Sequence, residues 1–133
     1  MSFTNENDAS PASSRRVLVV EDEFFIALEI KSALTTAGFD VLGPAGSVDH
    51  ALDLLHDTKP DAAVLDVDLA GERVTPVAMQ LKALAVPFVL ASAADRATLA
   101  QNSALAEVRN LGKPTDMRQL VEAVRAITDA LGS

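Results

Sequence analysis

Five polar side chains in four short segments of the chain could together capture a phosphoryl group. Each segment comes at the end of a predicted strand: Glu21 and Asp22 after residues 17–20, Asp66 after residues 62–65, Ser92 after residues 86–91, and Lys113 with Pro114 after Leu111. An aspartate can attack phosphorus and form an acyl phosphate. A hydroxyl, an ammonium group and a divalent cation can hold the phosphoryl oxygens by position and charge.

We expect these side chains to meet because each apolar stretch is typical of a buried strand. Residues 17–20 are apolar on both faces, as in strands covered on both sides by helices. In a parallel α/β sheet the carboxyl ends of the strands converge on one edge, where binding sites form. The chain would therefore bring together groups that lie far apart in sequence.

The acidic side chains predict a magnesium site. Glu21 and Asp22 could hold Mg²⁺ together with Asp66, and Asp68 could add its backbone carbonyl. Mg²⁺ prefers octahedral oxygen coordination and keeps several waters, so a few protein ligands are enough.

Asp66 is the predicted nucleophile, with Lys113 and Ser92 as its helpers. Lys113 would place a positive charge on one phosphoryl oxygen, and the Ser92 hydroxyl would donate a hydrogen bond to another. Each residue also has an ordinary interpretation, as a helix cap or as a solvated surface side chain. What favours the site is that all of them follow the appropriate strands in the appropriate order. His50 and His56 are expected to be exposed, since no carboxylate or second histidine completes a ligand set with them.

The composition favours one soluble domain. The chain has 133 residues, 49% of them hydrophobic, no cysteine and a formal net charge of −8. The lack of cysteine excludes disulfides, thiolate metal sites and a thiol nucleophile. The negative charge disfavours nucleic acid as a partner. No apolar stretch approaches the roughly 20 residues of a membrane span, and no secretory signal is recognisable. We therefore expect a cytoplasmic protein without a membrane partner.

The hydrophobic periodicity predicts five strands that alternate with five helices. The strands are expected at residues 17–20, 39–42, 62–65, 86–91 and 107–111, and the helices at 25–37, 48–55, 75–84, 94–106 and 117–131. Ser47 is an expected cap of the second helix, and Thr115 or Asp116 of the last. With right-handed crossovers this is an α/β, doubly wound, five-stranded parallel sheet with strand order 2-1-3-4-5, the flavodoxin-like arrangement.

Two regions of this plan are weaker than the others. Residues 94–106 have helical propensity but a thin apolar stripe, so they should form the least firmly held helix. Residues 107–111 mix polar and apolar side chains and should form an edge strand. Residues 1–14 are polar and are expected to be a flexible N-terminal tail, which leaves residues 15–133 as the folded domain.

The chain resembles the receiver domains of two-component response regulators over about residues 15–132. The resemblance is carried by four motifs: residues 19–23 (VVEDE), 65–69 (LDVDL), 91–93 (ASA) and 112–114 (GKP). It implies the phosphoacceptor position for Asp66, a need for Mg²⁺, and phosphoryl transfer from a histidine kinase or a histidine phosphotransfer protein. It also implies slow self-dephosphorylation rather than turnover of a separate substrate, so the chain is expected to be a signalling domain and not an enzyme.

The sequence departs from the family pattern at two positions. Receivers usually carry Tyr or Phe three residues before the lysine, where ring rotation is coupled to the hydroxyl residue, and this chain has Asn110 there. They also often carry an aromatic residue after the proline, where this chain has Thr115. Residues 43–47 and 86–88 resemble a subgroup of short stand-alone receivers that also lack the switch aromatic, so the usual aromatic switch is not expected.

The main hypothesis is a single-domain response regulator whose phosphorylation shifts the fourth helix and its neighbours. The face of the fourth helix, fifth strand and fifth helix would then bind a downstream protein or a second copy in a homodimer. Two alternatives stay open. One is a phosphatase of haloacid-dehalogenase type, which the Asp66 and Asp68 pair superficially fits, although that family places the pair on its first strand. The other is a receiver-like interaction module that is never phosphorylated.

Overall fold

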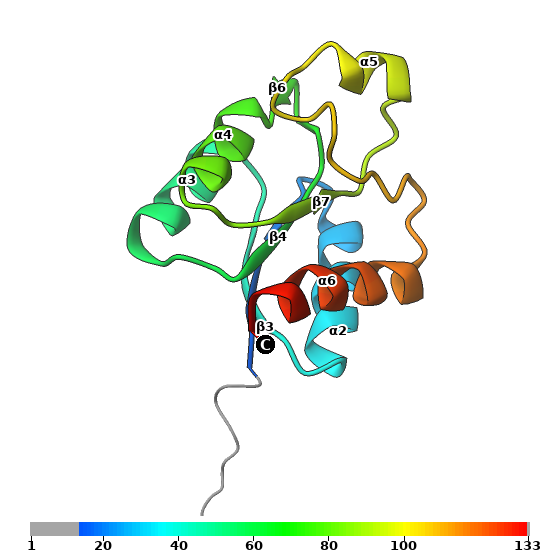
Figure 1. The fold of residues 1–133 in the computed structure, drawn as a ribbon. Coiled ribbons are helices and arrows are strands. Elements are labelled where there is room, and N and C mark those ends of the chain that lie inside the picture. The colour runs from blue at the N-terminus through cyan, green and yellow to red at the C-terminus, as the bar shows by residue number, and fades with distance from the viewer. Residues whose placement is uncertain (1–13, 133) are drawn as a thin grey trace, which may run out of the picture.

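A central parallel sheet with helices on both faces makes up the structure, a computed structural model that describes residues 14–132 (Figure 1). The sheet has four strands in the order β3-β2-β4-β7. Their bounds are β2 (Arg16–Val20), β3 (Asp40–Ala45), β4 (Ala62–Leu65) and β7 (Phe88–Leu90). All neighbouring strands are parallel. The predicted tail, residues 1–14, lies outside the described residues except for Ser14.

The strands form where the sequence is apolar on both faces, because each face of the sheet is covered. Leu18 and Val20 of β2 belong to a core cluster shared with α3 (Val48–Asp57) and α4 (Thr75–Ala83). Val17 and Val19 belong to a second cluster shared with α2 (Phe24–Thr36) and α6 (Met117–Gly132). Figure 1 shows these two helix pairs on opposite sides of the sheet. The alternation along β2 thus determines which helices each side chain contacts.

Several helix ends lie where the residue types predict them. The Ser47 hydroxyl accepts the His50 N–H at 3.1 Å and caps α3. Asp116 accepts the N–H groups of Arg118 and Gln119, at 2.9 and 3.2 Å, at the start of α6. Gly38 has φ of +99° just beyond α2, a conformation that glycine adopts without strain. Asp116, and not Thr115, is therefore the cap of the last helix.

The predicted fifth strand is reduced to a single bridge, so the five-stranded order is not confirmed. Asn110 forms one parallel bridge with Leu90. The Leu90 N–H donates to the Arg109 carbonyl at 2.9 Å, and the Leu111 N–H donates to the Leu90 carbonyl at 2.8 Å. The segment therefore lies beside β7, where the order 2-1-3-4-5 would place it. It does not extend into a ladder because the Asn110 side chain takes up the neighbouring backbone groups.

The fourth predicted helix is also much shorter than expected. It covers only α5 (Arg96–Ala100), with Asp95 as its cap. Its thin apolar stripe supplies few buried contacts, and beyond Ala100 the chain continues in turns that Leu105, 1% exposed, anchors to the core. A small antiparallel hairpin, β5 (Asp68–Leu69) and β6 (Glu72–Arg73), lies between the predicted strand at residues 62–65 and the predicted helix at 75–84.

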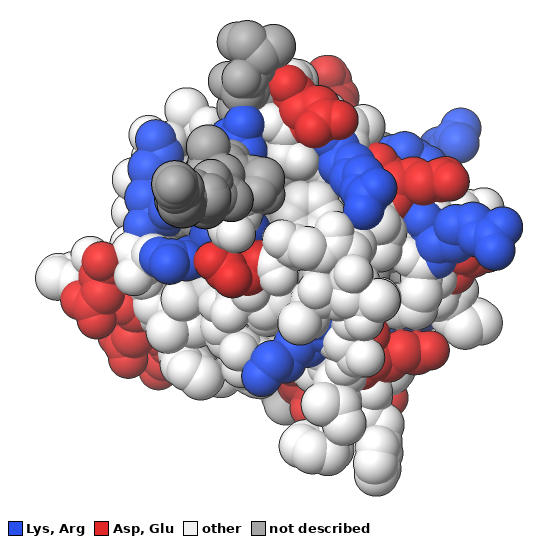
Figure 2. Space-filling view, turned by 90° about the horizontal axis from the view of Figure 1, so that it is seen from below, with Lys and Arg blue, Asp and Glu red and all other residues white. Residues whose placement is uncertain are grey.

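The surface carries charges of both signs. Figure 2 shows one face of the molecule, on which basic and acidic side chains are interspersed. Among residues 14–132, none of the helices combines the length and the apolar content that crossing a bilayer requires.

Candidate functional site

The strands of the sheet end in one row, and this row positions the site. Val20 is in register with Ala45 on one side and with Leu65 on the other, and Leu65 is in register with Leu90. The Asp66 N–H donates to the Val20 carbonyl at 2.9 Å. The polar residues that follow these strands are therefore held at the same edge of the sheet, as predicted.

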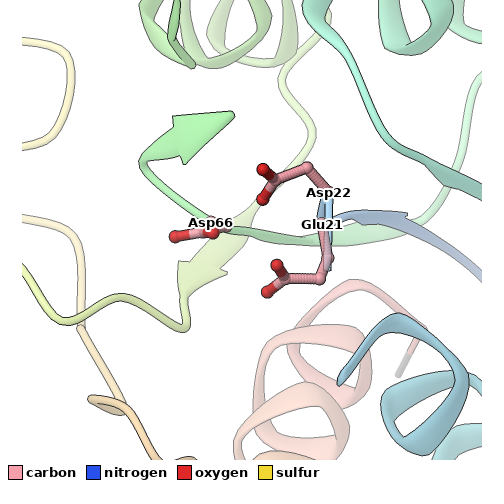
Figure 3. A group of neighbouring side chains, drawn as sticks. All are labelled: Glu21, Asp22 and Asp66. Carbon is pink, nitrogen blue, oxygen red and sulfur yellow. The ribbon is translucent and has the colours of Figure 1, made fainter. Parts of the chain in front are cut away.

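Three carboxylates gather at this edge. Oxygen atoms of Glu21, Asp22 and Asp66 lie within 4.8 Å of one another. Figure 3 shows the side chains leaving the ends of β2 and β4 and turning toward the same space. Glu21 and Asp66 are buried, with exposures of 2% and 6%, whereas Asp22 is exposed. The cluster is thus open on one side and closed on the other.

This donor set fits a hard divalent cation. Glu21 Oε1 is buried and makes no hydrogen bond to any described residue, although it lies 3.2 Å from Lys113 Nζ. A buried carboxylate oxygen without a hydrogen-bond donor is costly. The ammonium group beside it is shared with Glu23 and Asp66, so a further cation would stabilise it. Oxygen ligands that converge from both sides of an open space are what Mg²⁺ requires.

Lys113 reaches the same space from the far end of the chain. Its Nζ donates to Asp66 Oδ2 at 3.0 Å and lies 3.2 Å from both Glu21 Oε1 and Glu23 Oε2. Only 15% of the Lys113 side chain is exposed. The peptide bond between Lys113 and Pro114 is cis. The three distances show one ammonium group surrounded by three carboxylates.

The charges of the cluster perturb two titrating groups. Burial raises the pKa of Glu21 from 4.5 to about 6; the Asp66 charge also raises it, and the Glu23 N–H and Lys113 oppose the rise. Burial alone would lower the pKa of Lys113. Its hydrogen bonds to Asp66 and Glu21 outweigh that effect and raise the pKa, so Lys113 is cationic at neutral pH.

Ser92 lies one strand away from Asp66. The Ala91 N–H donates to the Leu65 carbonyl at 2.9 Å, which places Ser92 beside the end of β4. Ser92 is 2% exposed, and its hydroxyl accepts the Ala94 N–H at 3.0 Å. It does not cap a helix, which was the ordinary interpretation of this residue.

Asp68 is the one predicted site residue whose carboxylate lies outside the cluster. It is exposed and pairs with Arg73 at 3.4 Å across the β5–β6 hairpin. The sequence assigned Asp68 a role through its backbone carbonyl, and that role stays a prediction.

Comparison with known proteins then decides the family. Residues 17–125 match the response regulator receiver domain. The chain belongs to this family. It is 29% identical over 119 residues to the transcriptional regulatory protein PdtaR of Mycobacterium tuberculosis, which covers 88% of this chain and 58% of PdtaR. It is 36% identical over 87 residues to the sensory transduction protein LytT of Bacillus subtilis, which covers 63% of this chain and 36% of LytT.

Solved receiver structures confirm the fold. The receiver domain of the Francisella response regulator 1452 superposes with a TM-score of 0.77 at 22% identity, covering 89% of this chain and 99% of that one. A two-component response regulator from Clostridium difficile gives 0.80 at 16% identity, covering 90% and 100%. Receivers are signalling domains of two-component systems, and the match gives the haloacid-dehalogenase alternative no support. The chain spans about half or less of the curated relatives it matches.

Three residues of this receiver were not assigned to the site from the sequence. Glu23 contacts Lys113 at 3.2 Å, and the Ala70 N–H donates to Asp22 Oδ2 at 2.9 Å. Asn110 was noticed only as a missing aromatic, yet its side chain is hydrogen-bonded to both flanking loops. Glu23 is the third acidic residue of the motif at residues 19–23, and this position could have indicated that it belongs to the site. No pattern in the sequence indicates Ala70, because its contact is made by the backbone.

Proposed function

We propose that this receiver accepts a phosphoryl group on Asp66 from a phosphohistidine of a histidine kinase or a histidine phosphotransfer protein. An Asp66 oxygen attacks phosphorus, the P–N bond to the histidine breaks, and the imidazole leaves with the electron pair and takes up a proton. The product is an acyl phosphate. The observation that carries the proposal is the 3.0 Å contact of Lys113 Nζ with Asp66 Oδ2 inside the acidic cluster.

The residues of the cluster have distinct parts in this proposal. Glu21, Asp22 and Asp66, with the Asp68 carbonyl, would hold Mg²⁺, which supplies positive charge for the phosphoryl oxygens when it is bound. The Lys113 ammonium remains next to Asp66 and stabilises a second oxygen. The Ser92 hydroxyl accepts a hydrogen bond from Ala94, so its own proton is free to be donated to a phosphoryl oxygen.

Chemical phosphorylation tests the proposal directly. Incubation with acetyl phosphate and Mg²⁺ should add the mass of one phosphate group, and Asp66→Asn should abolish the addition. Asp68→Asn is the matched variant, because it removes a carboxylate two residues away but keeps the backbone carbonyl, so it should still be labelled. Equal labelling of wild type and Asp66→Asn would refute Asp66 as acceptor. No labelling of the wild type would favour the non-phosphorylated interaction module.

The surface beside the site suits a protein donor. One groove is lined both by Glu21 and Asp22 and by the apolar side chains of Phe24 and Leu28, which are 70% and 49% exposed. A donor whose histidine reaches Asp66 must cover this rim and would bury those apolar groups. Leu28→Asp should therefore slow transfer from a phosphotransfer protein and leave labelling by acetyl phosphate unchanged.

We propose that the phosphorylated protein signals by binding another protein, as in the single-domain type of regulator. In this structure the predicted output face consists of α5, residues 107–111 and α6. A groove there is lined by apolar side chains of α6, including Ile127, and by Val108 and Arg109. A downstream protein or a second copy would bind this face in its phosphorylated arrangement. Size-exclusion chromatography of the purified protein with and without acetyl phosphate would show whether phosphorylation produces a homodimer. A protein that stays monomeric would favour a different downstream protein.

A further inference from the structure

The side chain of Asn110 is hydrogen-bonded to two loops of the candidate site at the same time. Its Oδ1 accepts the N–H of Ser92 at 3.0 Å and the N–H of Gly112 at 3.1 Å. Its Nδ2 donates to the carbonyl oxygens of Ser92, at 3.1 Å, and Ala94, at 3.4 Å. A side-chain amide offers two lone pairs and two N–H donors, so its hydrogen-bonding capacity is fully used.

The two loops carry the two groups that would contact a phosphoryl group. Ser92 supplies the hydroxyl, and the Ser92–Ala94 turn, which holds that hydroxyl by the Ala94 N–H at 3.0 Å, is itself bonded to Asn110. Gly112 directly precedes Lys113, whose Nζ lies 3.0 Å from Asp66 Oδ2. The Asn110 amide therefore links the segment that orients the hydroxyl with the segment that carries the ammonium.

Backbone pairing does not make this link at the edge of the sheet. The bridge between Leu90 and Asn110 is the one parallel bridge between β7 and the 107–111 segment among the described residues. Beyond Leu90 the Asn110 side chain forms the bonds that a longer strand pair would have formed. Beyond Leu90, the hydrogen bonds that join the two loops are therefore those of the Asn110 side chain.

We propose that Asn110 is a positioning residue that clamps Ser92 and Lys113 in a fixed relation. This inference rests on the proposed phosphoryl site and adds to it how the site is held. An amide with all its hydrogen bonds made cannot rotate without breaking them. The switch therefore does not work by side-chain rotation at position 110: the 92–94 and 110–113 segments move as one unit when a phosphoryl group draws their side chains inward.

Amide hydrogen exchange of the unphosphorylated, metal-free protein tests the clamp without any phosphorylation. In Asn110→Ala the Ser92 and Gly112 amides should exchange about tenfold faster, because each loses its acceptor. In Asn110→Asp the increase should be smaller, because a carboxylate oxygen still accepts both N–H groups although it cannot donate to the Ser92 and Ala94 carbonyls. Unchanged exchange in Asn110→Ala would overturn the clamp.

Asn102→Ala is the matched control. Asn102 is also half-buried, donates to Thr75 Oγ1 at 2.8 Å and accepts the Ala104 N–H at 3.0 Å, but contacts neither loop. Its removal should leave the Ser92 and Gly112 amides protected. If it exposes them as much as Asn110→Ala does, the protection reflects general stability and the proposal fails.

Phosphorylation kinetics separate positioning from a merely structural role. With acetyl phosphate and Mg²⁺, Asn110→Ala should be labelled about tenfold more slowly than wild type, whereas Asn102→Ala should match it. In a Ser92→Ala background the Asn110→Ala substitution should slow labelling less, because the hydroxyl that it positions is gone. Equal slowing in both backgrounds would overturn the clamp. If the wild type takes up no phosphate, the proposed function fails, while amide exchange still decides the clamp.

Discussion

Removing the buried carboxylate of Glu21 should stabilise the protein at neutral pH and leave its stability unchanged in acid. Glu21 is 2% exposed, and burial raises the pKa of its carboxyl from 4.5 to about 6. The folded state therefore binds a proton more tightly than the unfolded state does. Below pH 4.5 the group is protonated in both states, so burying it carries no charge penalty. As the pH rises to 6 and above, stability is lost because the folded state must hold a buried charge.

The size of the effect follows from the pKa change. One pKa unit corresponds to about 1.4 kcal/mol, so the ionised Glu21 destabilises the metal-free fold by about 2 kcal/mol at pH 7.5. Glu21→Gln has a neutral side chain of similar shape at every pH. The free energy of unfolding of Glu21→Gln minus that of wild type should therefore rise from near zero at about pH 4 to about 2 kcal/mol at about pH 7.5.

Urea unfolding followed by far-ultraviolet circular dichroism in EDTA measures this difference, since the chain has no Trp or Tyr for fluorescence. The acid measurement needs dilute protein, because its pH is close to the isoelectric point of about 4.5, where a low net charge promotes association. Glu23→Gln is the control: that carboxylate also lies 3.2 Å from Lys113 Nζ, but its side chain is 60% exposed. Its removal should change stability by less than about 1 kcal/mol. Parallel pH curves for wild type and Glu21→Gln would refute the reasoning.

Three further predictions concern other parts of the structure. Lys113→Met should lower the free energy of unfolding at pH 7 by about 3 kcal/mol in urea titrations, because buried carboxylates lose their cation; an unchanged midpoint would contradict this. Mg²⁺ at about 100 times its dissociation constant should stabilise the wild type by about 2.7 kcal/mol, and Asp22→Asn should need more Mg²⁺ for the same thermal shift. Leu105→Ala should destabilise the fold by about 2–5 kcal/mol, and a smaller loss would mean that the turns after α5 are not anchored in the core.

The sequence predicts the meeting of the charged side chains better than it predicts the secondary structure around them. The buried strands, the cap at Ser47 and the meeting of Glu21, Asp66 and Lys113 follow from local apolar runs and parallel topology, and the structure has all of them. These features depend on residues that are adjacent in sequence or on the shared end of parallel strands. They do not require knowledge of individual tertiary contacts.

The features that the sequence does not predict depend on such contacts. Helical propensity at residues 94–106 is outweighed because few of its side chains can be buried, and the chain is held by Leu99 and Leu105 instead. The β5–β6 hairpin requires a positive φ at Ala70, of 51°, which no residue preference would suggest. Its tip is stabilised from outside, by the Asp22 carboxylate.

The charges of the site predict that phosphorylation requires a bound cation. Glu21, Glu23 and Asp66 all contact the one ammonium group of Lys113, and Asp22 belongs to the same carboxylate cluster. Within the described residues the cluster is therefore negative before any phosphoryl group arrives. A phosphoryl donor is itself anionic, so its approach to Asp66 is opposed unless further positive charge is present. Labelling by acetyl phosphate should accordingly disappear in EDTA and return with Mg²⁺. Labelling that persists in EDTA would mean that Lys113 alone compensates the charge, and the carboxylate cluster would then need another explanation.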